Sequence, residues 1–85
     1  MTDGPASPKE LLEYLARGLV DEPDEVVVNE VREEDGTIVL ELSVGEDDYG
    51  SVIGRGGRTA TALRTVIKTA AVKSGHRVFV DIIDD

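Results

Sequence analysis

The segment at residues 54–58, Gly-Arg-Gly-Gly-Arg, contains the residue types in this chain that are best suited to binding an anion. Glycine has no side chain, so the backbone N–H groups of such a segment can come within hydrogen-bond distance of a phosphate. We predict that the amides of Gly56, Gly57 and Arg58, at the start of a helix, form an anion-binding concavity with the Arg55 side chain at its edge. The chemistry expected of this segment is therefore phosphate binding.

Basic residues are concentrated around this segment, and acidic residues lie elsewhere in the sequence. Residues 49–80 hold six Lys or Arg and no Asp or Glu, although the whole chain has 9 basic and 18 acidic residues and a net charge of −9. Repulsion among clustered cations raises the free energy of the protein unless an anion is bound among them. Arg58, in the first turn of the expected helix, also interacts unfavourably with the helix dipole. Arg64 and Lys68 extend the cations into a strip that suits a chain of phosphates, although a solvated helix face would also explain these two residues.

Other glycine motifs and catalytic arrangements do not match the sequence. A P-loop needs four residues between its glycines and then Gly-Lys-Ser/Thr, and a dinucleotide fingerprint needs Gly-x-Gly-x-x-Gly after a strand. No serine stands in a recognisable frame with His76, which is the only histidine, and the chain has no cysteine. We therefore expect a binding protein rather than an enzyme, with no cofactor and no metal.

The first element expected is a helix that begins after a short tail. Residues 1–6 are predicted to be a disordered N-terminal tail, and residues 7–85 a single domain. Ser7, followed by Pro8 and by Glu10, predicts a helix cap. The helix should end before Pro23, and its apolar stripe should consist of Leu11, Leu12, Leu15 and Leu19.

A hairpin is expected next. Val-rich residues 25–33 predict a strand, residues 33–36 a turn and residues 37–44 a second strand. In the second strand one face is apolar, with Ile38, Leu40, Leu42 and Val44. The other face should be solvated, and it carries Thr37, Val39, Glu41 and Ser43.

The glycine segment should lie between two further helices. Asp48 is predicted to cap a short helix over residues 49–53, and the carboxylates at residues 46–48 lack the spacing of a calcium loop. A long helix is expected from Arg58 to about Ser74, with an apolar face formed by Leu63, Ile67, Ala70, Ala71 and Ser74. Gly75 should terminate it, and residues 77–83 alternate as a third strand. Tyr49 and Phe79 are expected to pack internally, so no aromatic RNA-stacking sheet is expected.

The string Ile53-Gly54-Arg55-Gly56-Gly57, flanked by two predicted helices, resembles the Ile-Gly-x-x-Gly signature of the KH domain. The expected order of elements, αββααβ, resembles the type II arrangement of this domain. With the chain length and the sequence Arg-Thr-Ala-Thr-Ala-Leu-Arg-Thr at residues 58–65, the chain resembles the small bacterial single-KH proteins of the KhpA family. The resemblance extends over about residues 9–83.

The resemblance implies an α+β fold, in which a three-stranded mixed sheet with one parallel pair is backed by three helices. It also implies a groove for single-stranded RNA between the glycine segment and the last strand. By position, Gly54 and Gly57 would fix the loop, Arg55 and Gly56 would contact phosphates, and Ile53 would form the floor of the groove. The expected RNA-binding residues are therefore Ile53, Gly54, Arg55, Gly56, Gly57, Arg58, Arg64 and Lys68.

We therefore expect a cytoplasmic module that binds single-stranded RNA and acts as an RNA chaperone or post-transcriptional regulator. The resemblance adds a second KH-containing protein as a partner, and a homodimer. No apolar run approaches the length of a membrane span, so no membrane partner is expected. The alternative is a protein-interaction or dimerisation module whose acidic residues 21–25 and 30–35 bind a basic partner, with Val39 and Val72 as contacts.

Overall fold

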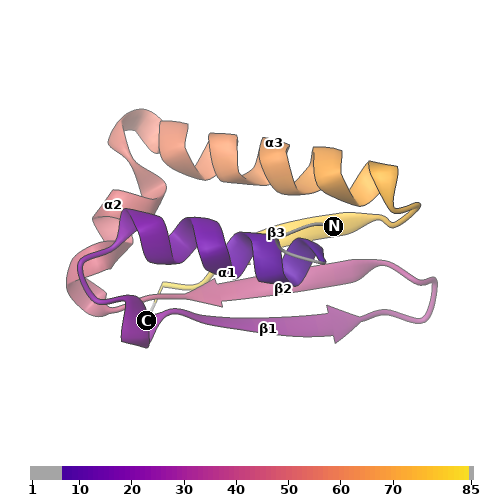
Figure 1. The fold of residues 1–85 in the computed structure, drawn as a ribbon, viewed down its shortest axis with the longest axis horizontal. Coiled ribbons are helices and arrows are strands. Elements are labelled where there is room, and N and C mark those ends of the chain that lie inside the picture. The colour runs from indigo at the N-terminus through magenta and orange to yellow at the C-terminus, as the bar shows by residue number, and fades with distance from the viewer. Residues whose placement is uncertain (1–6, 85) are drawn as a thin grey trace, which may run out of the picture.

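The computed structural model describes residues 7–84, which form three α-helices and three β-strands in the predicted order αββααβ. The bounds of these elements (Figure 1) are α1 Pro8–Leu19, β1 Val27–Arg32, β2 Ile38–Ser43, α2 Tyr49–Ile53, α3 Arg58–Lys73 and β3 Val78–Ile82. The tail predicted at residues 1–6 lies outside the described residues. No helix within residues 7–84 is both long enough and apolar enough to cross a membrane.

α1 begins where its sequence provides a cap. The Ser7 hydroxyl oxygen accepts a hydrogen bond from the Glu10 N–H at 3.2 Å, and Pro8 occupies the first helical position. Leu12 is fully buried, as the apolar stripe predicts. Leu19 was expected on the same stripe but is 41% exposed, because it is the last residue of the helix and borders an open groove between α1 and α3.

The three strands form one mixed sheet in the order β1–β2–β3. β1 and β2 are antiparallel, with Val28 opposite Leu42, whereas β2 and β3 are parallel, with Leu42 opposite Ile82. A parallel pair requires a crossover connection, and here α2, the glycine segment and α3 supply it. The glycine segment is therefore the turn between the two helices of that crossover.

The turn between β1 and β2 is closed by Asp35 and Gly36. Gly36 adopts a φ of 91°, in the left-handed region that favours glycine, and its N–H donates to the Glu33 carbonyl oxygen at 3.0 Å. The Thr37 N–H donates to the Asp35 carboxylate at 2.9 Å; this bond, then a side-chain bond with Thr37 and the charge of Arg77, lowers the pKa of Asp35. Thr37 was predicted on the solvated face but is buried, because it is enclosed by these contacts across the turn.

The Asp48 side chain does not cap α2. Its carboxylate is buried and accepts hydrogen bonds from the backbone N–H groups of Asp21 at 3.0 Å and Glu22 at 3.1 Å. These two amides lie in the connection between α1 and β1, where no strand or helix partner satisfies them. The prediction of a helix cap is wrong because both oxygens of this carboxylate accept hydrogen bonds from a distant part of the chain and not from α2.

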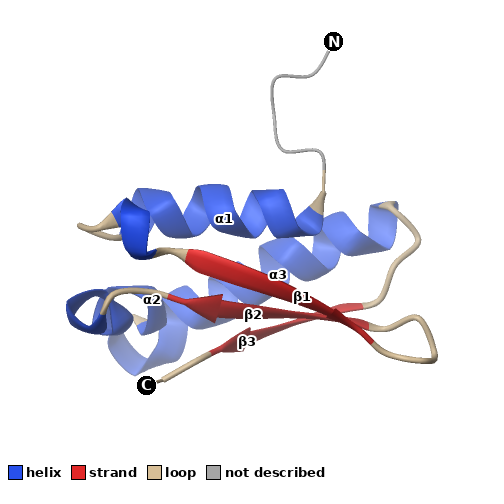
Figure 2. Cartoon of the chain, turned by 90° about the horizontal axis from the view of Figure 1, so that it is seen from below, coloured by secondary structure: helices blue, strands red, loops and turns tan. Residues whose placement is uncertain are grey.

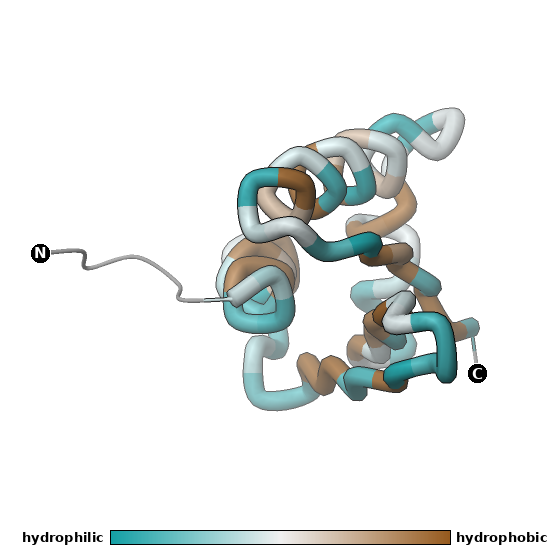
Figure 3. Tube along the Cα trace, turned by 90° about the vertical axis from the view of Figure 1, so that its right-hand side faces the viewer, coloured by the Kyte–Doolittle hydropathy of each residue, from teal (hydrophilic) through white to brown (hydrophobic). Residues whose placement is uncertain are grey.

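α1 and α3 lie on the same face of the sheet and pack against each other (Figures 1 and 3). The predicted face of α3 is buried at Leu63, Ile67 and Ala71, whereas Ser74 is exposed because it follows the end of the helix. Tyr49 packs against the core as expected.

The largest fully buried side chains come from both layers and are Leu12, Leu40, Leu42, Val52 and Ile67. In Figure 2 the strands lie in front of α3, so the sheet has one covered and one open face.

Candidate nucleic-acid interface

Gly54 joins α2 to the glycine segment in a conformation that is essentially restricted to glycine. Its φ is 78° and its ψ is 168°, and its N–H donates to the Gly50 carbonyl oxygen at 2.8 Å. A Cβ atom at Gly54 would lie 2.7 Å from Thr59 Cβ and 2.8 Å from Thr59 N, and would also overlap Thr59 Oγ1. Gly54 therefore allows the end of α2 and the start of α3 to approach each other closely.

Two of the three amides predicted to bind an anion are used inside the loop. The Gly57 N–H donates to the Gly54 carbonyl oxygen at 3.0 Å, and the Arg58 N–H donates to the Arg55 carbonyl oxygen. These bonds close two overlapping turns of four residues each, in which Gly56 and Gly57 adopt the positive φ values that favour glycine. The Gly56 amide has no hydrogen-bond partner within residues 7–84. The predicted concavity of three amides is therefore wrong, and the Gly56 amide alone of the three remains available.

The outer surface of the loop is open. Gly56 and Gly57 adopt φ values of 64° and 77°, and no atom lies within 4 Å of the place where a Cβ would stand on either residue. Arg55 and Gly56 are exposed, as predicted. A ligand backbone can therefore lie directly against the main chain here, since no side chain of these two glycines separates them.

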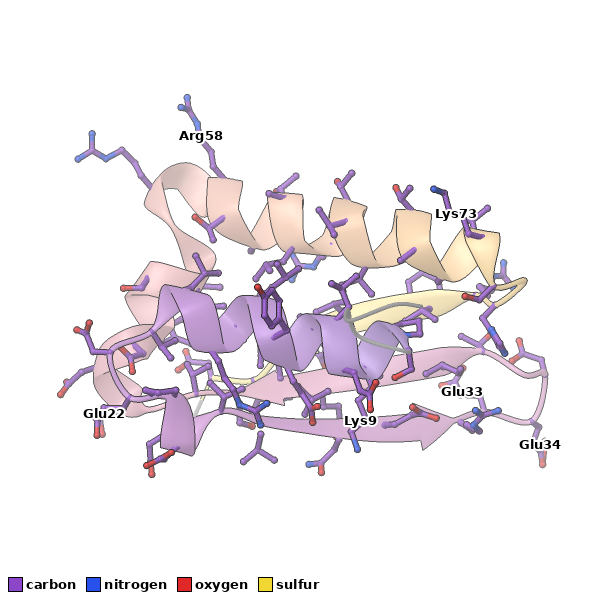
Figure 4. The ribbon with its side chains drawn as sticks, in the orientation of Figure 1. Lys9, Glu22, Glu33, Glu34, Arg58 and Lys73 are labelled. Carbon is purple, nitrogen blue, oxygen red and sulfur yellow. The ribbon has the colours of Figure 1, made fainter. Side chains whose placement is uncertain are left out.

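Most of the cations of residues 49–80 lie in the glycine loop and along α3. Arg58 points away from the body of the molecule at the start of α3, and Lys73 lies near the other end (Figure 4). Arg64 and Lys68 are exposed between them, and Arg58 and Lys68 are about 15 Å apart along the helix axis. Within residues 7–84 no Asp or Glu oxygen lies within 4.0 Å of a side-chain nitrogen of Arg55, Arg58, Arg64 or Lys68. Their charge is thus not neutralised by an ion pair with any of the described residues.

A groove between α3 and β3 continues from the cations. It is lined by Thr61, Arg64, Thr65 and Lys68 of α3 and by residues 78–80 of β3. The Arg64 Nε–H donates to the Val80 carbonyl oxygen at 3.3 Å, which ties the helix to the strand. Because β3 is an edge strand, backbone groups on its outer side have no strand to pair with. The fold therefore brings two predicted site residues, Arg64 and Lys68, beside the last strand.

The positions of Ile53 and Phe79 can be compared with what the sequence predicted for them. Ile53, at the end of α2, is partly buried and packs against the core, and its expected place at the floor of the groove remains a prediction. Phe79 was expected to pack internally but is 48% exposed. Its neighbour Val78 is buried, and successive strand residues point to opposite faces, so Phe79 faces away from the helices. The alternation of β3 contained the signal for this exposure.

The family model of the KH domain of KhpA and KhpB matches residues 9–82. The chain belongs to the KhpA/KhpB KH-domain family. This match confirms the resemblance read from residues 53–57, and the observed α+β fold, with a mixed three-stranded sheet and three helices, is that of a type II KH domain.

Curated relatives of similar length agree with the family match. An RNA-binding protein KhpA from Clostridium acetobutylicum is 59% identical over 75 residues, which cover 88% of this chain and 99% of the relative. An RNA-binding protein KhpA from Mycobacterium bovis is 49% identical over 73 residues, which cover 86% of each chain.

Among solved structures, the fold resembles part of the Era protein. A crystal structure of Aquifex aeolicus Era bound to GDP.AlF4- superposes with a TM-score of 0.60 at 17% identity. The match covers 92% of this chain and 31% of that protein. An Era structure in complex with MgGDPNP and nucleotides 1506-1542 of 16S ribosomal RNA gives the same values. At this level of identity the similarity shows the fold alone.

Proposed function

We propose that the protein binds single-stranded RNA along the outer surface of the glycine loop and the groove between α3 and β3. The observation that carries this proposal is the open surface of Gly56 and Gly57 beside four cations that no carboxylate of residues 7–84 neutralises. Relatives with up to 59% identity that are named RNA-binding protein KhpA support it.

In this proposal the loop and the groove bind different parts of the RNA. The sugar-phosphate backbone lies against Gly56 and Gly57, where the Gly56 N–H donates to a phosphate oxygen and Arg55 and Arg58 provide charge. The bases point into the groove, where Arg64 can donate to base edges with the guanidinium N–H groups that do not bond Val80. Recognition depends mainly on hydrogen bonds, because Phe79 is the single aromatic residue among those that line the groove. Modest sequence preference follows.

The cellular role that we propose is that of an RNA chaperone or post-transcriptional regulator, which acts with a second KH-containing protein or as a homodimer. A lone KH domain contacts few nucleotides, so pairing two of them would raise the affinity for one RNA. The apolar groove between α1 and α3 supports a protein contact. Its walls include Tyr14, Leu19 and Val66, which are 67%, 41% and 45% exposed.

The proposal is tested by measuring the affinity for short unpaired RNAs while the salt concentration is raised. Contacts to two or three phosphates predict a log-log slope between about −1.4 and about −2.1, since each contact contributes about −0.7 on a single strand. The double variant Arg55→Asp/Gly56→Asp should abolish binding while thermal unfolding changes little, because both positions are exposed.

A matched control is available on α1, because Arg17 and Gly18 are also an exposed Arg-Gly pair. Arg17→Asp/Gly18→Asp makes the same change in charge away from the glycine loop. Because both residues line the α1–α3 groove, the variants are compared at protein concentrations at which the wild type is monomeric, and there this control should retain most of the RNA affinity. Equal losses in the two double variants would show that net charge alone governs binding, and the proposed site would then be abandoned.

The alternative function is a protein-interaction module in which the glycine loop binds no RNA, and the α1–α3 groove is the observation that favours it. Crosslinking in cells separates the two functions. RNA adducts that disappear in the Arg55→Asp/Gly56→Asp variant support the first, whereas protein adducts alone support the second.

A further inference from the structure

The open face of the sheet carries an apolar row that crosses all three strands. Val31 of β1 is the register partner of Val39 of β2, which is in turn the partner of Phe79 of β3. The three side chains point away from α1 and α3, since the alternate positions Ile38 and Val78 are buried against the helices. With neighbouring strands about 4.8 Å apart, the row is about 10 Å wide.

The two outer side chains of this row are largely open to solvent. Val31 is 43% exposed and Phe79 is 48% exposed, and Phe79 is the only phenylalanine of the protein. An antiparallel pair with one solvated face usually places polar residues on that face. Val39, between Val31 and Phe79, is half-buried, and a contiguous apolar row that is open to solvent at both ends indicates a contact surface on a small protein.

The next row along the strands is acidic. Glu41 of β2 and Asp81 of β3 are register partners on the same open face, two residues beyond Val39 and Phe79. Like charges directly opposite each other destabilise a sheet, and no cation lies within 4.0 Å of either carboxylate in the described chain. On the other side of the row Arg77 lies near Asp35, whose charge offsets it. The open face is therefore apolar in one row and negative in the next.

We propose that this open face binds a basic protein segment that carries apolar side chains, with its apolar residues on Val31, Val39 and Phe79 and its Lys or Arg residues on Glu41 and Asp81. Nucleic acid does not fit, because its phosphates would meet two carboxylates. A basic segment would also remove the repulsion between Glu41 and Asp81. The face lies on the side of the sheet opposite α1 and α3, so an occupant leaves the exposed surface of the glycine loop free. The proposal thus goes beyond RNA binding and does not depend on it.

The test is an NMR titration of the isotope-labelled full chain with three synthetic peptides of equal length. The Lys-Leu peptide has the spacing of an amphipathic helix, with Leu on one face and Lys on its flanks; the Lys-Ser peptide replaces each Leu by Ser, and the Glu-Leu peptide replaces each Lys by Glu. The first should shift the amide signals of Val31, Val39 and Asp81 with saturation, and its affinity should fall as salt is added. The Lys-Ser peptide should bind at least about tenfold more weakly, because it buries no apolar surface on the row. The Glu-Leu peptide should not bind.

Two variants test which residues carry the binding. Val31→Lys removes an exposed edge of the row and adds a like charge, and Glu41→Gln/Asp81→Asn removes the carboxylates while keeping the side-chain shapes. Each should weaken the Lys-Leu peptide about tenfold. As a matched control, Glu34→Gln in the hairpin turn should have no effect. Unchanged affinity in the first two variants, or shifts confined to residues 33–35, would overturn the proposal.

RNA binding separates this inference from the proposed function. Val31→Lys and Glu41→Gln/Asp81→Asn should retain RNA affinity, whereas Arg55→Asp/Gly56→Asp should retain peptide affinity. If the protein binds RNA but gives no saturable response to the Lys-Leu peptide, the sheet-face proposal is refuted and the RNA proposal stands. If it binds the peptide but no RNA, the RNA proposal is refuted and the sheet-face proposal stands.

Discussion

The glycine loop with α3 and the open face of the sheet are two exposed surfaces with opposite chemistry. At the loop, Arg55 and Arg58 flank bare glycines, and no carboxylate within residues 7–84 pairs with them. On the sheet, Glu41 and Asp81 are register neighbours next to an apolar row, and neither forms an ion pair with a cation of the described residues. Each surface places like charges together, which raises the free energy of the isolated chain. Opposite charges within one small domain can therefore serve two different partners.

The acidic residues themselves show that a charge has different roles in different places. The Asp48 carboxylate is buried and bonded to two backbone amides, and the Asp35 carboxylate closes a turn. Glu41 and Asp81 have no such partners among the described residues. A carboxylate that the fold uses stabilises the domain, whereas a carboxylate that it does not use is available to another molecule.

The largest effect is expected at Gly54, which shapes the basic surface. Gly54→Ala should lower the free energy of unfolding by about 2–5 kcal/mol, because the new Cβ would overlap Thr59 in a backbone conformation that favours glycine. RNA affinity should fall with it. Gly57→Ala is the matched control, since its Cβ would meet no atom within 4 Å, and it should lose only about 1–2 kcal/mol. Equal losses in urea unfolding would mean that Thr59 adjusts to the added Cβ.

A smaller effect is expected from Asp48, the carboxylate that the fold uses. Asp48→Ala should lower the free energy of unfolding by about 2–4 kcal/mol, because the amides of Asp21 and Glu22 lose a charged acceptor. Asp47→Ala, at the exposed neighbouring position, should change it by less than about 0.5 kcal/mol. RNA affinity should not change in either folded variant. Thermal unfolding measures the difference, and similar values for the two variants would contradict it.

At Asp81, which forms no ion pair within residues 7–84, substitution should raise the free energy of unfolding rather than lower it. Asp81→Asn should raise the free energy of unfolding by about 0.2–1 kcal/mol at low salt, because it removes the repulsion from Glu41. The gain should shrink at high salt, where surface charges are screened. Asp84→Asn, beyond the end of the strand, serves as the control. A loss of stability in Asp81→Asn would show that this carboxylate has a partner within the chain.

The smallest effect on stability is expected at Asp35, and it should depend on pH. Its pKa lies below the ordinary value of 3.8, first because the Thr37 N–H bonds to the carboxylate. A carboxyl with a lowered folded-state pKa adds stability above pH 3.8, and that stability disappears as the pH falls through the folded-state pKa. The difference in unfolding temperature between the wild type and Asp35→Ala should therefore be largest near neutral pH and vanish in acid. A difference that does not change with pH would indicate a steric effect of the substitution.

Most of the fold could be predicted from local signals. Ser7 and Gly75 mark helix ends, and the alternation of apolar residues in β2 and β3 fixes which side of each strand is buried. The parallel pairing of β2 and β3 could be predicted only from the family resemblance, because no local pattern reports which strands become neighbours.

The details of the site depend on tertiary contacts that the sequence does not display. The amides of Gly57 and Arg58 donate to carbonyl oxygens of two tight turns inside the loop, and the Asp48 carboxylate bonds amides that lie far before it in the chain. At Phe79 the alternation of the strand indicated exposure, but the apolar character of the ring suggested burial. The strand position decided the outcome.

The position of the glycine loop inside the crossover has a consequence for the synthesis of the protein. Val31 meets Val39 across a short turn, whereas Ile38 meets Val78 only after the whole crossover has been made. Contacts between distant residues form after local ones, because closing a long segment costs more entropy. A nascent chain can therefore form its hairpin early, but its groove is complete only after β3 has left the ribosome and docks beside β2.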